Sequence, residues 1–400
     1  MLQNDVLHND AVAEITAEVV GWRHLIHANP ELGFRERETA GFVAERLRSF
    51  GLEVHEGIGG TGVVGTLRSG SGRRAIGLRA ELDALPIVER SGKPYASRNH
   101  GVMHACGHDG HTAMLLGAAK LLSRHPNFDG TIHFVFQPAE ENEGGSMRML
   151  EDGLLERFPM EGIYAVHNWP GLPFGMIATR IGPMMAAVDN FELRFLGTGA
   201  HAAMPHQGDD PILAAGEFIS SVQRIVSRAV DPQMALVVSL TQVHGGNVGN
   251  IVPGEVWLQG TCRFFEPTLS ESCERLIGSI AKGIASAHGL AAQLDYKRGY
   301  PAVINTPEPV ANSVDAASSA VGRDKVMTEF LPSMGCEDFA YMARAAGGAY
   351  AWIGAGEVGP AEGLHGDRYV FNDEIVPIGL RYWVSLAEQV LPASRDASAT

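Results

Sequence analysis

The sequence has few of the features that mark a disulfide scaffold, a membrane anchor or a nucleic-acid partner. Only 4 of its 400 residues are cysteines, and their scattered positions exclude a disulfide framework. No run of about 18 apolar residues is present to span a bilayer. The N-terminal stretch lacks the basic start and apolar run of a secretory signal. A formal net charge of -15 disfavours phosphate backbones and anionic lipid. These absences predict a cytoplasmic protein that binds neither nucleic acid nor membrane.

The length and the hydrophobic content are those of a chain with two domains. A chain of 400 residues, 45% of them hydrophobic, exceeds what one compact core holds. In residues 1–186 and 298–400, helical patterns alternate with short apolar strands, which predicts an α/β domain with a mainly parallel sheet and helices on both faces. Between 187 and 297 the order becomes β-α-β-β-α-β. This order predicts an inserted α+β domain of the ferredoxin-like type.

The segment MHACGHDGHTA places Cys106 and His108 two residues apart, just before a predicted helix. Alternate residues of an extended loop point the same way, so both side chains could face one ion. Thiolate and imidazole are common ligands of zinc and similar metals. A buried cysteine beside a surface histidine explains the pair equally well when it is taken alone.

The segment QPAEENEGG places Glu140 and Glu141 side by side after an apolar strand. Adjacent carboxylates repel each other, and a cation would offset that repulsion. One carboxylate could bind a metal while the other takes a proton from a metal-bound water. The alternative is an ordinary solvated acidic loop.

Further polar residues follow other apolar strands. His167 ends the strand in AVHNWP, His365 lies in the loop GLHGDRYVFND, and Glu81 and Asp83 follow a strand in RAELDALP. Each one alone is explained by a core histidine, a loop histidine or a surface turn. Together they lie at the carboxyl ends of strands, where open α/β sheets bind ligands. The residues therefore indicate a metal-dependent hydrolase of the α/β type.

The chain resembles the aminoacylase/carboxypeptidase metallopeptidase family, and within it the subgroup of hippurate hydrolases and indoleacetyl-amino-acid hydrolases. The resemblance covers nearly the whole chain, and the cysteine-containing run MHACGHDGHTA is highly specific to the subgroup. The matching segments are HANPELGFRERET (27–39), RAELDALPI (79–87), MHACGHDGHTAMLLGAA (103–119), FQPAEENEGG (136–145), AVHNWP (165–170), GTGAHAAMPHQGDDPI (197–212), GNIVPGEVWLQGTCR (249–263), GCEDFAYM (335–342) and LHGDRYVFNDE (364–374).

The resemblance implies a metal-dependent amidohydrolase that cleaves N-acyl-amino acids. It implies a catalytic domain over 1–186 and 298–400, and a lid over 187–297 that forms a homodimer or higher homo-oligomer. Two divalent ions, zinc or manganese with nickel or cobalt as further options, would be held by five ligands: Cys106, His108, Glu141, His167 and His365.

The remaining roles are also carried over from the resemblance. Glu140 would be the general base and then the acid, and Asp83 would orient a ligand. On the lid, His201 would stabilise the oxyanion and Asn250 would lie near the substrate. Glu81 stands where more distant relatives have a histidine ligand, so it is left out of the metal set.

Two other functions are weighed against this one. A dipeptidase or aminopeptidase could use the same metal centre, and a non-catalytic relative could keep the metal site without the chemistry. Glu140 argues against the second, because a metal site has no structural need for a carboxylate beside the ligand Glu141. Zinc-dependent base deamination is excluded, because its H-x-E and P-C-x-x-C motifs are missing. The preferred acyl group cannot be predicted from the sequence.

Overall fold

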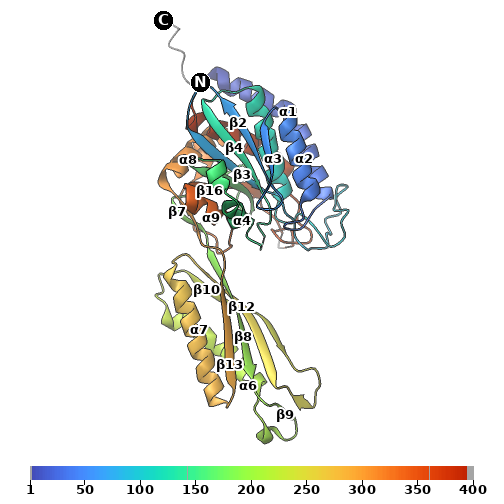
Figure 1. Cartoon of the computed structure of the whole chain (residues 1–400), viewed down its shortest axis with the longest axis vertical. Coiled ribbons are helices and arrows are strands. Elements are labelled where there is room, and N and C mark those ends of the chain that lie inside the picture. The colour runs from blue at the N-terminus through green and yellow to red at the C-terminus, as the bar shows by residue number, and fades with distance from the viewer. Residues whose placement is uncertain (1, 142, 360, 394–400) are drawn as a thin grey trace. The chain divides into compact units, whose positions relative to one another are not determined.

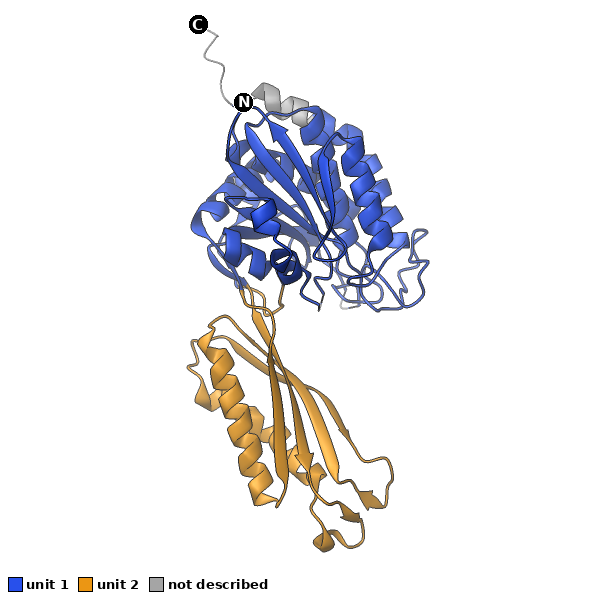
Figure 2. Cartoon of the chain, viewed as in Figure 1, with its two compact units in different colours: residues 1–184, 303–331, 338–400 blue, residues 185–302, 332–337 orange. Residues whose placement is uncertain are grey.

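The computed structural model describes residues 2–141, 143–359 and 361–393, and the chain divides into two compact units (Figure 2). Unit 1 comprises residues 1–184, 303–331 and 338–400, and unit 2 comprises residues 185–302 and 332–337. Unit 2 is larger than the insertion predicted at 187–297, because it extends to residues 185 and 302 and the chain returns to it at residues 332–337. The returning segment is held by Ala186, whose N–H group lies 3.0 Å from the Ser333 carbonyl oxygen and 2.8 Å from that of Gly335.

Unit 1 is built on one eight-stranded sheet with the strand order β1-β2-β4-β3-β5-β16-β6-β15. Its centre, β4-β3-β5-β16, is parallel, while β1, β2 and β6 run antiparallel to their inner neighbours. The strand bounds are β1 (Glu53–Ile58), β2 (Gly62–Ser69), β3 (Ala75–Glu81), β4 (Gly130–Gln137), β5 (Ile163–Pro170), β6 (Ile177–Ala178), β15 (Val326–Met327) and β16 (Gly348–Gly356). A further ladder joins β7 (Gly182–Met185) to β14 (Val303–Asn305).

Helices flank both faces of this sheet, which confirms the predicted α/β architecture (Figure 1). One layer contains α2, α3, α8 and α10, with α1 packed against α3 and α10, and α4 and α9 pack together against β4 and β5. The bounds are α1 (Leu2–Ala28), α2 (Arg37–Ser49), α3 (His108–Arg124), α4 (Gly145–Glu151), α5 (Leu154–Arg157), α8 (Pro307–Val321), α9 (Phe339–Ala346) and α10 (Val376–Val390).

The central strands are apolar on both faces because both are covered. All eight residues of β4 except Thr131 are buried, and the last six of β3 are buried as well. The packing of α3 explains its sequence: 15 consecutive residues from His108 to Leu122 are buried. Such a helix lies between the sheet and an outer helix, so it lacks the polar stripe of a surface helix.

Unit 2 has the predicted ferredoxin-like arrangement. Its antiparallel sheet has the order β10-β12-β8-β13, and α6 and α7 pack against it. Apolar and polar residues alternate along β12, as expected of a strand with one covered face. The bounds are β8 (Ala187–Leu196), β9 (Ala200–His201), α6 (Pro211–Val222), β10 (Leu236–Gly245), β11 (Ile251–Val252), β12 (Glu255–Phe264), α7 (Thr268–Ala287) and β13 (Ala291–Arg298).

Among the described residues, none of the helices combines the length and the hydrophobicity that crossing a bilayer requires.

Candidate metal centre

A tight turn before α3 places Cys106 and His108 at the carboxyl edge of the sheet. Gly107 lies between them with a φ of 94°, a conformation that costs a residue with a side chain about 1–2 kcal/mol. A Cβ atom here would also clash with the Asn168 side chain and would lie 2.7 Å from the Tyr369 hydroxyl. Only glycine fits both conditions. The turn brings the thiol and the imidazole into one buried cluster.

The five predicted metal ligands form two groups that share Cys106. One group contains Cys106, His108 and His167, and the other contains Cys106, Glu141 and His365; the ligand atoms of each group lie within 4.8 Å of one another. Cys106 Sγ lies 3.3 Å from His167 Nε2, and His365 Nε2 lies 3.4 Å from Glu141 Oε2. The structure thus brings together side chains from four separate segments of unit 1.

Hydrogen bonds orient two of the histidines toward the cluster. His108 Nδ1 donates to the Asp83 carbonyl oxygen at 2.9 Å and to Asp83 Oδ1 at 3.2 Å. His167 Nδ1 donates to the Asn168 carbonyl oxygen at 2.6 Å. In the neutral form of each ring this leaves Nε2 as the nitrogen that carries the lone pair. An acceptor on the far nitrogen fixes the ring of a metal-ligating histidine in this way.

The electrostatics of the cluster suit a bound cation. Burial, reinforced by the charges of Glu141 and Glu140, raises the pKa of the Cys106 thiol well above its ordinary value. Although burial opposes it, the hydrogen bond to Asp83 raises the pKa of His108 to about 10. His108 Nε2 is buried, makes no hydrogen bond within the described part of the chain, and lies 3.9 Å from one oxygen of Glu140 and one of Glu141. A metal ion would replace the proton on this nitrogen, and it would favour the thiolate that the carboxylates disfavour.

Glu140 lies beside this set and is only 6% exposed. One of its oxygens forms a close group with His108 and Glu141, although Glu140 belongs to neither of the two groups that share Cys106. A carboxylate in that place can exchange a proton with a molecule held by the ligands.

His365 is tied to the cysteine turn through its backbone. Its N–H group donates to the Ala105 carbonyl oxygen at 2.8 Å, and its φ is 63°. The side chain is 53% exposed, so the cluster is open to solvent on this side. A substrate could approach the cluster from there.

The two predicted lid residues lie together on unit 2. His201 in β9 pairs with Ile251 in β11, and Ala202 N–H donates to the Asn250 carbonyl oxygen at 3.0 Å. The side chains of His201 and Asn250 are exposed. The predicted metal ligands belong to unit 1, and these two residues belong to unit 2.

Sequence reasoning did not find the buried charged network beneath the cluster. Arg79 forms ion pairs with Glu81 and, at 3.1 Å, with Asp338, and its Nε donates to Gln137 Oε1 at 2.8 Å. His111 Nδ1 donates to Glu81 Oε2 at 2.8 Å. Glu81 is thereby engaged with Arg79 and His111, although it also forms a close group with His108 and His111. Charged residues inside the apolar strand β3 were the available signal, because a buried charge needs a partner.

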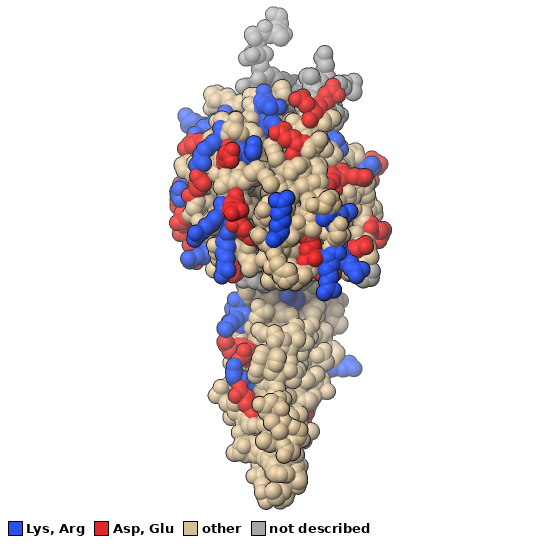
Figure 3. Space-filling view, turned by 90° about the vertical axis from the view of Figure 1, so that its right-hand side faces the viewer, with Lys and Arg blue, Asp and Glu red and all other residues tan. Residues whose placement is uncertain are grey.

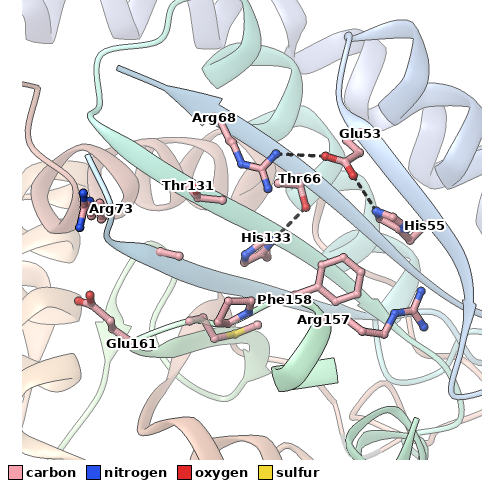
Figure 4. A pocket seen from close by; sticks show the side chains of 13 residues that line it. Glu53, His55, Thr66, Arg68, Arg73, Thr131, His133, Arg157, Phe158 and Glu161 are labelled. Atoms are coloured by element: carbon pink, nitrogen blue, oxygen red, sulfur yellow. Dashed lines mark hydrogen bonds and ion pairs between the residues drawn. The ribbon is translucent and has the colours of Figure 1, made fainter. Parts of the chain in front are cut away.

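A cavity of about 470 Å³ on unit 1 is a competing candidate site (Figure 4). Alternate residues of β1, β2 and β4 line it, and Thr66 and His133 meet there at 3.0 Å. Burial lowers the pKa of His133 to about 4. None of the predicted ligands lines this cavity, and none of the metal-capable groups found in the described ranges includes its residues. The cysteine cluster is therefore the better candidate for a metal site.

An α/β sheet with a thiol, imidazoles and carboxylates clustered at its carboxyl edge is the architecture of a metal-dependent hydrolase. The comparison with protein families agrees: the model of peptidase family M20/M25/M40 matches residues 77–389. The chain belongs to this family.

Curated relatives match over most of the chain. The hippurate hydrolase of Campylobacter jejuni is 39% identical over 383 residues, covering 95% of this chain and 98% of that protein. The N-acyl-L-amino acid amidohydrolase of Geobacillus stearothermophilus is 44% identical over 300 residues, with coverages of 74% and 80%. Thermostable carboxypeptidase 2 of Saccharolobus solfataricus is 35% identical over 380 residues, with coverages of 93% and 95%.

A solved structure matches the fold as well. The crystal structure of Bacillus subtilis YXEP, described as a dinuclear metal binding peptidase from the M20 family, superposes with a TM-score of 0.78 at 32% identity. The match covers 95% of this chain and 99% of that one.

Proposed function

We propose that this protein is a metal-dependent amidohydrolase that splits N-acyl-amino acids of the hippurate type into a carboxylic acid and a free amino acid. The observation that carries the proposal is the pair of ligand groups sharing Cys106, with the carboxylate of Glu140 beside them. The names of the relatives support it, since a hippurate hydrolase and an N-acyl-L-amino acid amidohydrolase match most of the chain.

The ligand chemistry fits two divalent ions held by Cys106, His108, Glu141, His167 and His365. The two groups sharing Cys106 and the dinuclear description of the YXEP relative support the number. Zinc or manganese suits this mixed thiolate, imidazole and carboxylate set, and nickel or cobalt would also fit. When bound, such ions polarise the amide carbonyl and bring the pKa of a water molecule toward neutrality.

The protein's own groups then move the proton and orient the substrate. Glu140 takes a proton from the attacking water and passes it to the amide nitrogen as the carbon–nitrogen bond breaks. His201 would donate a hydrogen bond to the developing oxyanion, and loss of one such donor costs roughly 100-fold or more in kcat. Asn250, which lies next to His201 on unit 2, would contact the substrate.

Chelation and metal replacement test the proposed function. The purified protein is stripped with a chelator, single divalent metals are added back, and amino-acid release is assayed from hippurate, other N-acyl-amino acids and a free dipeptide. Release that stops on stripping and returns with one metal is the expected result. Tight metal binding without cleavage of any compound would contradict the proposal in favour of a non-catalytic relative.

The same panel decides between acyl-amino acids and peptides. The similarity to a carboxypeptidase keeps peptide cleavage as the second candidate. We expect hippurate to be cleaved faster than a free dipeptide, because the segment MHACGHDGHTA is that of the hippurate hydrolase subgroup and a hippurate hydrolase matches most of the chain. Faster cleavage of the dipeptide would reverse the assignment.

A homodimer formed through unit 2 is also part of the proposal. Among the described strands, β10 is an edge strand of the unit 2 sheet, and its sequence LVVSLTQVHG contains no Lys, Arg, Asp or Glu. Exposed sheet edges usually carry charges that prevent pairing, so an uncharged edge suits a second copy. The adjoining helix α6 exposes Ile212 and Leu213, and charged side chains are sparse over much of the face of unit 2 seen in Figure 3.

The location of the protein in the cytoplasm stays a prediction.

A further inference from the structure

The segment that carries Glu140 and Glu141 begins with a strained residue. Ala139 has a φ of 52°, which is rare for a residue with a side chain, and it is only 1% exposed. It follows the end of β4 and directly precedes Glu140. Strained backbone of this kind persists only where the surroundings hold it in place.

Glu36 is the side chain that holds Ala139. Its Oε1 accepts the Ala139 N–H group at 2.8 Å, and its Oε2 accepts the Thr61 hydroxyl at 2.5 Å. Glu36 is fully buried and stands at the start of α2, where its carbonyl oxygen accepts the Ala40 N–H group. The carboxylate is therefore fixed at both oxygens and at its backbone.

Glu36 is one of three buried carboxylates that accept backbone N–H groups of this segment. Asp83 Oδ2 accepts from Glu141 at 3.0 Å, and Asp338 Oδ2 accepts from Ser146 at 2.9 Å. Asp83 and Asp338 hold the segment from Glu140 onward: the backbone of Glu140 also hydrogen-bonds to Asp83, and the Asp338 N–H group donates to Glu140 Oε1 at 3.4 Å. Of these three carboxylates, only Glu36 accepts a hydrogen bond from a residue that precedes Glu140. That residue is Ala139, which has the positive φ.

We propose that Glu36 is a positioning residue: by holding Ala139 in its left-handed conformation, it directs Glu140 toward the metal ligands. The proposal rests on the proposed function, in which Glu140 exchanges the proton. A buried carboxylate is costly to ionise, since burial raises the pKa of Glu36 to about 7. A stabilising role alone would be served better by an apolar side chain, whereas a fixed acceptor is what the Ala139 N–H group needs.

The decisive test is rescue by glycine. Glu36→Ala removes the acceptor and leaves Ala139 free to relax, which moves Glu140; a displacement of about 1 Å can cost up to 100-fold in rate. We expect kcat on hippurate to fall by about 10- to 100-fold while KM stays within about threefold, as for a lost transition-state interaction. Ala139→Gly in the same chain removes the steric penalty of positive φ. The double variant should recover about tenfold of the lost kcat.

Two further variants complete the set. Glu36→Gln keeps an oxygen acceptor, so its kcat should stay within about threefold of the unmodified protein. Glu31→Ala is the matched control: Glu31 accepts the Thr39 N–H group at 2.9 Å in the same stretch, without a bond to the Ala139 segment. It should lower thermal stability without changing kcat. Two outcomes would overturn the proposal. In one, Ala139→Gly fails to restore the kcat that Glu36→Ala has lost; in the other, Glu31→Ala lowers kcat as much as Glu36→Ala does.

Amide hydrogen exchange separates this inference from the proposed function. In the unmodified protein the Ala139 amide should be protected, and Glu36→Ala should expose it while Glu36→Gln should not. This readout needs no substrate. If the protein cleaves none of the compounds, the proposed function fails, and exchange still decides whether Glu36 holds the segment. Unchanged protection of Ala139 in Glu36→Ala would refute the positioning role, whatever the activity.

Discussion

Asp83 illustrates at the residue scale how one carboxylate can organise two metal ligands. Its Oδ1 accepts from His108 Nδ1, and its Oδ2 accepts from the Glu141 N–H group. Burial opposes ionisation, but the hydrogen bond from His108 lowers the pKa of Asp83 below its ordinary value. The ionised form, with acceptors on both oxygens, is the form that serves both neighbours.

Asp83→Asn should therefore weaken metal binding. An amide offers one acceptor and one donor, so either His108 or Glu141 loses its partner. We expect metal affinity to fall by about 10- to 100-fold, the usual effect of removing a partner behind a ligand. Competition with a chromogenic chelator measures this. The control is Asp152→Asn, since Asp152 accepts from Gly59 N–H in an exposed turn. Equal losses in the two variants would contradict the assignment.

His133 gives a prediction about pH that is independent of the metal centre. Burial lowers its pKa to about 4, so the folded protein keeps it neutral while the unfolded chain is protonated below about 6.5. The unfolded state then binds more protons, and stability is lost as pH falls from about 6.5 to 4. The loss amounts to about 3 kcal/mol.

His133→Gln should remove this part of the acid sensitivity. Between pH 7 and pH 4, the free energy of unfolding of the variant should decrease by about 3 kcal/mol less than that of the unmodified protein. Urea unfolding at a series of pH values measures the difference. Thr131→Val, a substitution of a non-titrating residue that lines the same cavity, is the control and should leave this pH dependence unchanged (Figure 4). The prediction is wrong if the free energy of unfolding depends on pH in the same way in His133→Gln and in the unmodified protein.

At the residue scale, the sequence predicts the candidate metal ligands, but it does not predict the buried carboxylates that hold their backbone in place. The ligands lie in short motifs next to strands, so the residue types and the topology together place them. The supports Glu36 and Asp338 act on a segment 103 and 192 residues away. No local pattern reports such a pairing, because it depends on how the elements pack.

At the scale of elements, periodicity predicted the long strands and helices, and it missed the short ones. The apolar run TIHFVFQP, stopped by Pro138, predicts a strand, and the structure has β4 there; the pattern near 307–322 predicts a helix, which is α8. A helix is also predicted near 336–346, but it begins only at Phe339, because Asp338 is part of the buried network with Arg79. The two-residue strands β6 and β15 were not predicted, because tertiary packing forms them rather than any repeat in the sequence.

The turn between β3 and α3 gives an element-scale prediction with a matched control. Gly107 and Gly101 both have positive φ, but a Cβ atom at Gly101 would meet nothing within 4 Å. Gly101→Ala should cost only the backbone term of about 1 kcal/mol. Gly107→Ala adds the clash with Asn168 and Tyr369, so it should cost about 3 kcal/mol or more and lower the metal content. Equal free energies of unfolding for the two variants would show that a Cβ atom at position 107 does not clash with Asn168 and Tyr369.

For the whole molecule, the proposed dimer can be tested at the edge of the unit 2 sheet. Val243 in β10 is 51% exposed. If two copies pair along β10, Val243→Lys places a charge without an opposite partner in their interface. This costs about 2–5 kcal/mol of association free energy, so the dimer Kd should rise by more than tenfold. Sedimentation over a range of concentrations measures this. Leu331→Lys, on a fully exposed leucine of unit 1, is the control and should leave the Kd unchanged. An unaltered Kd in Val243→Lys would exclude this edge.

The insertion of unit 2 also has a consequence for how the protein is made. Strand β16 lies between β5 and β6 in the middle of the sheet, yet it is translated after the whole of unit 2. The ligand His365 follows later still. A chain growing on the ribosome therefore has a complete unit 2 while the sheet of unit 1 still lacks a central strand. The two proposed ligand groups are complete only near the end of translation, so we expect metal loading to be a late step of the protein's biogenesis.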